Sequence, residues 1–163
     1  IVSRGRAAGY TMKLPQDDNR LERRKDFLAD LAMMLGGRVA EEIIFDDITT
    51  GASDDLKKAT ALAKAMVKKY GMADALGPRT YGKNEELIFL GRDMHEERDY
   101  SDATAEKIDE AVHSLIYEAQ ETAKRVINEH RADVEKIVAV LLEKESIEKE
   151  EFENIVGKKR IEN

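Results

Sequence analysis

The sequence predicts a mainly α-helical protein, a single helical domain of about five helices with a small β element near the N-terminus. Apolar residues recur every three to four positions through most of the chain, which is the period of an amphipathic helix. Alanine, leucine, glutamate, lysine and methionine dominate these periodic segments. Aromatic residues make up only 6% of the 163 residues, and tryptophan is absent. This composition favours helices over sheets.

The first predicted helix covers residues 21–45 and carries a run of apolar residues at helical spacing. These residues are Leu28, Leu31, Leu35, Val39 and Ile43. Gly36 and Gly37 fall inside the helix, where two glycines cost on the order of 2 kcal/mol relative to alanine. We therefore expect another backbone to approach this position closely, with a helix kink as the alternative.

Four more helices are predicted, and serines are the expected N-caps of three of them. The second helix follows Ser53 and ends at Gly71, whose lack of a side chain suits a helix terminus. The third follows Ser101 and runs to about residue 129, the fourth covers residues 134–142, and a short fifth follows Ser146.

The β element is predicted from two short segments. Residues 9–14 alternate in polarity and end at Pro15, and residues 87–90 form an apolar run between polar turns. Without any internal repeat, we expect one domain over residues 1–157 and a basic and polar tail over residues 158–163.

Composition excludes several classes of protein and site. With 27 basic and 34 acidic residues the net charge is -7, which argues against nucleic-acid binding. The absence of cysteine excludes disulfides and thiolate metal sites, so a zinc ion would need histidine and carboxylate ligands. No apolar stretch approaches the roughly 18 residues that span a bilayer. The chain does not start with an initiator methionine, and its first residues do not resemble a signal peptide. We therefore expect them to come from the middle of a longer chain.

Acidic residues gather at two places that deserve comparison with metal sites. Asp54 and Asp55 begin the second predicted helix, and Glu41 and Glu42 lie near the end of the first. A carboxylate in a first helical turn is explained by the helix dipole and the free N–H groups alone. A glutamate pair on a helix is usually part of a solvated face.

The histidines do not form a recognisable site. His95, His113 and His130 are 18 and 17 residues apart, never the four that H-E-x-x-H requires, so we expect them to be structural. The chain also lacks a Gly-x-x-x-x-Gly-Lys-Ser/Thr loop, which predicts no ATP binding by this segment. No nucleophile motif frames a serine.

A series of short motifs carries a family resemblance over nearly the whole chain. They are Gly9-Tyr10-Thr11, GGRVAEE at 36–42, TTGASDD at 49–55, Tyr70-Gly71-Met72, FLGR at 89–92 and Tyr100-Ser101. In this order they resemble the peptidase domain of FtsH, the family of membrane-anchored, ATP-dependent zinc metalloproteases. The family's H-E-x-x-H helix and its ATPase module are missing from this sequence.

The resemblance implies a role for each acidic candidate. Asp55 would be the third zinc ligand, with two histidine ligands and the general base supplied by a preceding segment. Asp54 would be an exposed charge at the helix terminus. Glu41 would lie beside the metal, either holding a ligand histidine through its ring nitrogen or acting as the alternative third ligand. The segment alone is then expected to be inactive.

The resemblance also implies partners and a location. Unfolded or membrane protein substrates would add to an edge strand at Gly9, Tyr10, Thr11 and Met12. The parent would be a homo-hexamer, anchored in a membrane with this domain on the cytoplasmic, matrix or stromal side and without direct membrane contact. ATP and Mg²⁺ would bind only through the absent ATPase module.

A second hypothesis belongs to another class of protein. The chain could be a non-catalytic helical interaction or oligomerisation domain that kept the scaffold and lost the metal centre. The sequence that precedes Ile1 discriminates between the two, because an H-E-x-x-H motif there would establish the protease.

Overall fold

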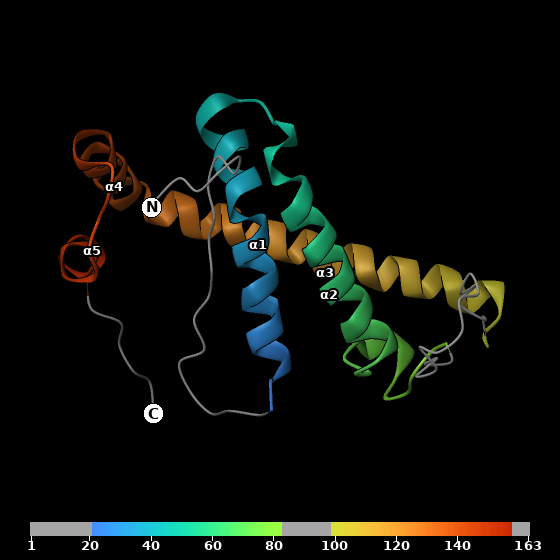
Figure 1. Cartoon of the computed structure of the whole chain (residues 1–163). Helices are drawn as coiled ribbons and strands as arrows, with labels where there is room; N and C mark the ends of the chain where they lie inside the picture. The colour runs from blue at the N-terminus through green and yellow to red at the C-terminus, as the bar shows by residue number, and fades with distance from the viewer. Residues whose placement is uncertain (1–20, 83–98, 158–163) are drawn as a thin grey trace, which may run out of the picture. The chain divides into compact units, whose positions relative to one another are not determined.

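The computed structural model describes residues 21–82 and 99–157, which form helices joined by turns (Figure 1). The five α-helices are α1 (Arg24–Phe45), α2 (Ser53–Lys68), α3 (Asp102–Glu129), α4 (Arg131–Lys144) and α5 (Lys149–Val156). Two 3₁₀ turns, η1 (Thr50–Ala52) and η2 (Asp74–Leu76), precede and follow α2. The prediction of a mainly helical chain with about five helices is confirmed. Both predicted strands, at residues 9–14 and 87–90, lie outside the described residues.

The described residues fall into two compact units. The first covers residues 21–125 and contains α1, α2 and most of α3. The second covers residues 126–157 and contains the end of α3 together with α4 and α5. Within these ranges no helix is both long and apolar enough to cross a lipid bilayer.

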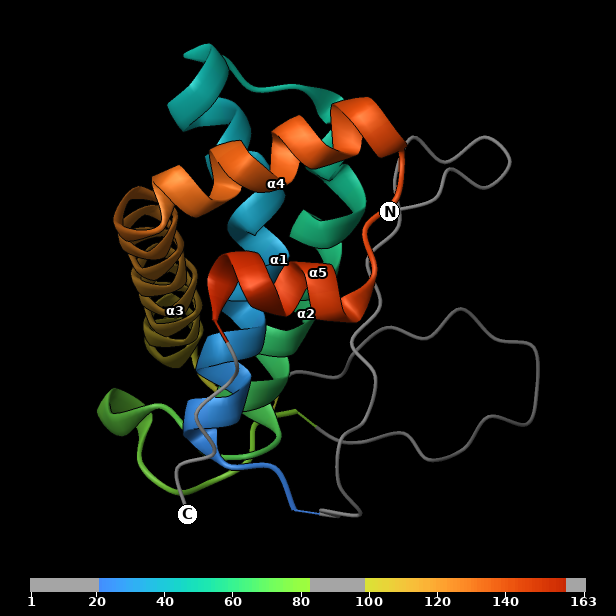
Figure 2. The same cartoon turned by 90° about the vertical axis from the view of Figure 1, so that its left-hand side faces the viewer.

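The core of the first unit is formed by α1, α2 and α3, with α1 and α2 side by side (Figures 1 and 2). Leu31 of α1 and Met66 of α2 are completely buried. Ala59 and Ala63 are also completely buried, and their small side chains allow α2 to lie close to its neighbours. The remaining members of this cluster are Phe27, Leu35, Val67, Ala73, Tyr81, Ile108, Leu115 and Ala119.

The two glycines inside α1 do not have the environment that the sequence suggested. The helix continues through Gly36 and Gly37, and no atom outside the helix lies within 4 Å of the place where a Cβ would be built on either residue. The expected close approach of another backbone is therefore wrong for the described part of the chain. Gly71, just after α2, is different because its φ is +60° and a Cβ there would lie 3.2 Å from the Arg79 nitrogen.

These two environments predict opposite effects of the same substitution. Gly37→Ala is expected to raise the free energy of unfolding by about 0.5–1 kcal/mol, because alanine restricts the unfolded chain and meets no obstacle in the helix. Gly71→Ala is expected to lower it by roughly 1–2 kcal/mol, because an L-residue is strained at positive φ. Urea unfolding of the two variants tests the difference. Equal effects of the same sign would contradict the environments described here.

Only one of the three predicted serine caps is confirmed. The Ser101 hydroxyl accepts a hydrogen bond from the Thr104 amide at 3.3 Å, at the start of α3. Ser53 is instead the first residue of α2, because η1 runs directly into the helix and the Ser53 amide donates to the Thr50 carbonyl. Ser146 lies before α5, whose N-cap residue is Glu148.

The second unit buries little of its apolar surface. Figure 2 shows α4 and α5 joined by a short connection, and a 2.7 Å ion pair between Lys144 and Glu151 links them. Neither helix contains a buried residue, and Leu142 is 82% exposed. Two short helices present too little facing surface to enclose the apolar stripes that their sequences contain.

Candidate metal centre

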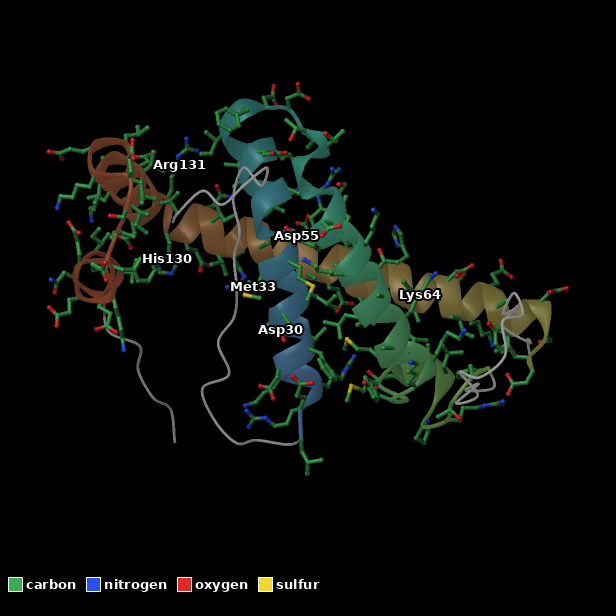
Figure 3. All side chains as sticks on the ribbon, in the orientation of Figure 1. Asp30, Met33, Asp55, Lys64, His130 and Arg131 are labelled. Carbon is green, nitrogen blue, oxygen red and sulfur yellow. The ribbon has the colours of Figure 1, made fainter. Side chains whose placement is uncertain are left out.

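Asp55 lies in the first turn of α2, at the third position of the helix (Figure 3). Its carboxylate is half exposed, with 50% of its side-chain surface accessible. In the described part of the chain, the carboxylate forms an ion pair with the Lys58 ammonium, 3.8 Å away. That distance is too long for a hydrogen bond, so the carboxylate oxygens remain available to a ligand.

Asp54 has the same nearest cation and a more exposed position. Its carboxylate lies 3.7 Å from Lys58, and 78% of its side-chain surface is accessible. Consecutive helical residues point about 100° apart, so Asp54 and Asp55 face different directions. Exposed ion pairs of this kind stabilise a helix only weakly. Asp54 therefore corresponds to the exposed helix-terminal charge that the sequence predicted.

Glu41 contacts the loop between α1 and α2 through both of its carboxylate oxygens. The Thr49 amide donates to Oε2 at 2.9 Å, and the Thr49 hydroxyl donates to Oε1 at 2.8 Å. The Thr49 Oγ1 in turn accepts a hydrogen bond from the Gly51 amide at 3.1 Å. We call these three residues the loop clamp. The hydrogen bonds from the Thr49 amide and hydroxyl hold the pKa of Glu41 below its ordinary value.

The loop clamp leaves little room for a side chain at residue 51. A Cβ on Gly51 would lie 3.2 Å from the Thr49 Oγ1 and 3.6 Å from the Glu41 Oε1. A larger residue would therefore press on the hydroxyl that links the carboxylate to the turn. The next residue, Ala52, is buried, and α2 begins immediately after it.

Glu42 contacts a different element from Glu41. Its carboxylate pairs with the Lys124 ammonium of α3 at 2.9 Å and accepts a hydrogen bond from Gln120 at 3.3 Å. The hydrogen bond with Lys124 lowers the pKa of Glu42 and raises the pKa of Lys124. The two consecutive glutamates thus connect α1 to the loop and to α3, rather than forming a solvated face.

The described residues do not assemble a complete metal site. No group of three or more histidine, cysteine or acidic side chains in residues 21–82 and 99–157 has a geometry that could hold an ion. A single exposed carboxylate without a hydrogen bond, as at Asp55, fits a site in which the other ligands come from elsewhere. Carboxylate oxygen is among the ligands that zinc accepts, so the chemistry of Asp55 is compatible with that metal.

The histidines are placed as the sequence suggested where the structure describes them. His113 is exposed and stacks on Tyr117, with ring centroids 6.4 Å apart. His130 lies at the start of α4, where its Nδ1 is 3.5 Å from Asp133 (Figure 3). His95 lies outside the described residues, as do the predicted edge-strand residues Gly9, Tyr10, Thr11 and Met12.

Sequence reasoning missed two residues around the candidate site. Thr49 was recognised only as part of a motif, although a hydroxyl residue directly before a glycine-containing turn is a signal for local side-chain hydrogen bonds. No sequence pattern indicates the ion pair of Lys124, because its partner Glu42 is 82 positions earlier in the sequence (124 − 42).

Comparisons with known proteins find similarity over nearly the whole chain. The model of peptidase family M41 matches residues 1–155. The ATP-dependent zinc metalloprotease FtsH 1 of Thermomicrobium roseum is 44% identical over 160 residues, which are 98% of this chain and 24% of that protein. The FtsH proteins of Chloroflexus aggregans and Thermotoga maritima are 46% and 43% identical, with 96% of this chain aligned in each case and 24% and 26% of the relative. The chain spans about a quarter of the length of these relatives.

Proposed function

The chain belongs to peptidase family M41, and from this membership we propose that it supplies the third zinc ligand, Asp55, to an ATP-dependent zinc metalloendopeptidase. Two histidine ligands and the general base come from another segment of the complete protein. When bound, the zinc ion polarises the scissile carbonyl and lowers the pKa of its water towards about 7. Relatives that match nearly the whole chain are named as zinc metalloproteases, which supports the metal.

The observation that carries this proposal is the state of the Asp55 carboxylate. It is half exposed, lies beyond hydrogen-bond distance of its nearest cation, and belongs to the first turn of a helix whose later turns bury one face in the core. Such a carboxylate is accessible to an ion, while its helix is held rigidly by the core. Glu41, the alternative ligand, has both oxygens engaged by Thr49, which favours Asp55 for the metal.

The substrates are proposed to be unfolded proteins and proteins extracted from membranes. Main-chain hydrogen bonds to the substrate would accept many side-chain sequences, and we assign this contact to Gly9, Tyr10, Thr11 and Met12, which lie outside the described residues. The complete protein is a membrane-anchored homo-hexamer with this domain on the cytoplasmic, matrix or stromal side. ATP and Mg²⁺ act through its ATPase module, and nucleic acid is not a partner.

Metal removal from the complete protein tests the proposed function. A zinc chelator is expected to stop hydrolysis of a fluorescently labelled unfolded protein, and added zinc is expected to restore it, because the reacting water is activated by the ion. ATP hydrolysis under the same conditions is the control, since its Mg²⁺ site is separate. Hydrolysis that continues at full rate after chelation would contradict the proposal.

The isolated chain provides the complementary measurement. With Asp55 as one ligand, residues 1–163 are expected to bind zinc no more tightly than an exposed carboxylate pair, and to show no hydrolysis at any zinc concentration. Calorimetric titration measures the affinity. Tight one-to-one binding would mean that the ligands are other residues of this chain. The alternative function, a non-catalytic helical interaction domain, is favoured only if the complete protein also fails to bind zinc.

A further inference from the structure

The hydrogen bonds of the loop clamp connect the loop between α1 and α2 to the last turns of α1. Residues 46–51 are all exposed, and Asp46 adopts a left-handed conformation with φ of +52° at the end of α1. An exposed loop with little apolar burial has low local stability unless hydrogen bonds hold it. The clamp supplies such hydrogen bonds from Glu41, one helical turn before α1 ends.

The first turn of α2 follows the loop clamp directly, and fewer of its residues are buried than in the later turns. The first completely buried residue of α2 is Ala59, one turn after Asp55. Before that turn, the backbone is positioned by Leu56, which packs against the core, by the buried Ala52, and by the clamp residues that precede it. A carboxylate in this turn therefore takes its position from the core on one side and from the clamp on the other.

We infer that Glu41 is a positioning residue that acts through Thr49, and that the loop clamp presets the Asp55 carboxylate for metal binding. This inference rests on the proposed function, in which Asp55 is a zinc ligand. Glu41 suits the role because a carboxylate offers two acceptors, and Thr49 presents two donors to it at 2.9 and 2.8 Å. Residues that orient a ligand typically change metal affinity by about 10–100-fold when they are replaced.

Two substitutions break the loop clamp from opposite ends. Thr49→Val keeps the shape of the side chain but removes the hydroxyl that donates to Glu41 and accepts from Gly51. Glu41→Gln replaces one acceptor oxygen with an NH₂ group, which donates hydrogen bonds but cannot accept them. Thr49→Ser restores the hydroxyl. Thr60→Val is the matched control, because Thr60 also loses a hydroxyl hydrogen bond, to the Leu56 carbonyl of α2 at 2.8 Å.

The measurement is the zinc affinity of the complete protein, by competition with a chromogenic chelator, together with hydrogen exchange over residues 46–55. We expect Thr49→Val and Glu41→Gln to weaken zinc binding by about tenfold or more and to speed exchange in this segment. Thr49→Ser and Thr60→Val are expected to behave like the wild type. Unchanged melting temperatures of the zinc-free proteins establish that the loss is local. If Glu41→Gln does not fold, the zinc affinity of Thr49→Val still decides. If Thr49→Val does not fold, the exchange of residues 46–55 in zinc-free Glu41→Gln decides, because it reports on the loop without the metal.

Two results would overturn the inference. Wild-type zinc affinity in Thr49→Val would show that the clamp does not position the ligand. Loss of affinity in Glu41→Gln alone would show that Glu41 acts without Thr49, for example by contacting the metal or a histidine directly. Failure of the proposed function has a different signature, because Asp55→Ala would then retain zinc whatever the clamp variants do.

Discussion

Replacing Asp55 with alanine in the complete protein is expected to reduce hydrolysis of an unfolded protein to background, and replacing Asp54 is expected to leave most of it. The two residues are neighbours in the first turn of α2 and share Lys58 as their nearest cation. They differ in direction and exposure, with 50% of the Asp55 side chain accessible and 78% of that of Asp54. Removing a zinc ligand opens the coordination shell, whereas removing a helix-terminal charge costs about 0.3–1 kcal/mol of helix stability.

The pair of variants is informative because each controls for the other. Both remove one negative charge from the same turn, so general effects on the helix dipole and on Lys58 cancel in the comparison. Initial rates of hydrolysis and bound zinc per subunit are measured for both, with ATP hydrolysis as the check that the remainder of the protein is intact. Equal losses of activity in the two variants would refute Asp55 as the ligand, and Glu41→Ala would then be the variant to examine.

Leu31→Ala is expected to have the largest effect on stability, lowering the free energy of unfolding by about 2–5 kcal/mol. Leu31 is completely buried in the cluster formed by α1, α2 and α3, so truncation removes apolar contacts and leaves a cavity. For a chain of this size each kcal/mol shifts the melting temperature by roughly 2–4 °C. The transition is therefore expected roughly 4–20 °C lower.

Met33→Ala is the matched control for this core substitution. Met33 lies two positions further along α1, is 47% exposed, and is on the side of the helix away from α2 (Figure 3). Alanine is a better helix former than methionine, so little stability is lost at an exposed position. Thermal unfolding followed by circular dichroism measures both variants. If Met33→Ala destabilised the protein as much as Leu31→Ala, the assignment of the α1 faces would be wrong.

Local pattern was sufficient for the helices and for the core face of α1. Apolar spacing predicted one stripe on α1, of which Leu31, Leu35 and Val39 are buried, while Leu28 and Ile43 are partly buried. This works because a helix repeats every 3.6 residues, so spacing alone determines which side chains share a face. The helix predicted at residues 134–142 is confirmed as part of α4, but its apolar spacing does not lead to burial, since Leu142 is mostly exposed. Periodicity reports which face is apolar but not whether another element covers it.

Contacts between distant residues could be known only from the tertiary structure. The sequence determined by itself the helical class, the family motifs and the identity of Asp55 as the candidate ligand. The tertiary structure decided that Glu41 is occupied by Thr49 and that Glu42 pairs with Lys124, eight and 82 positions away. The physical reason is that a hydrogen bond or ion pair depends on the separation of two atoms in space, which chain folding sets and sequence spacing does not.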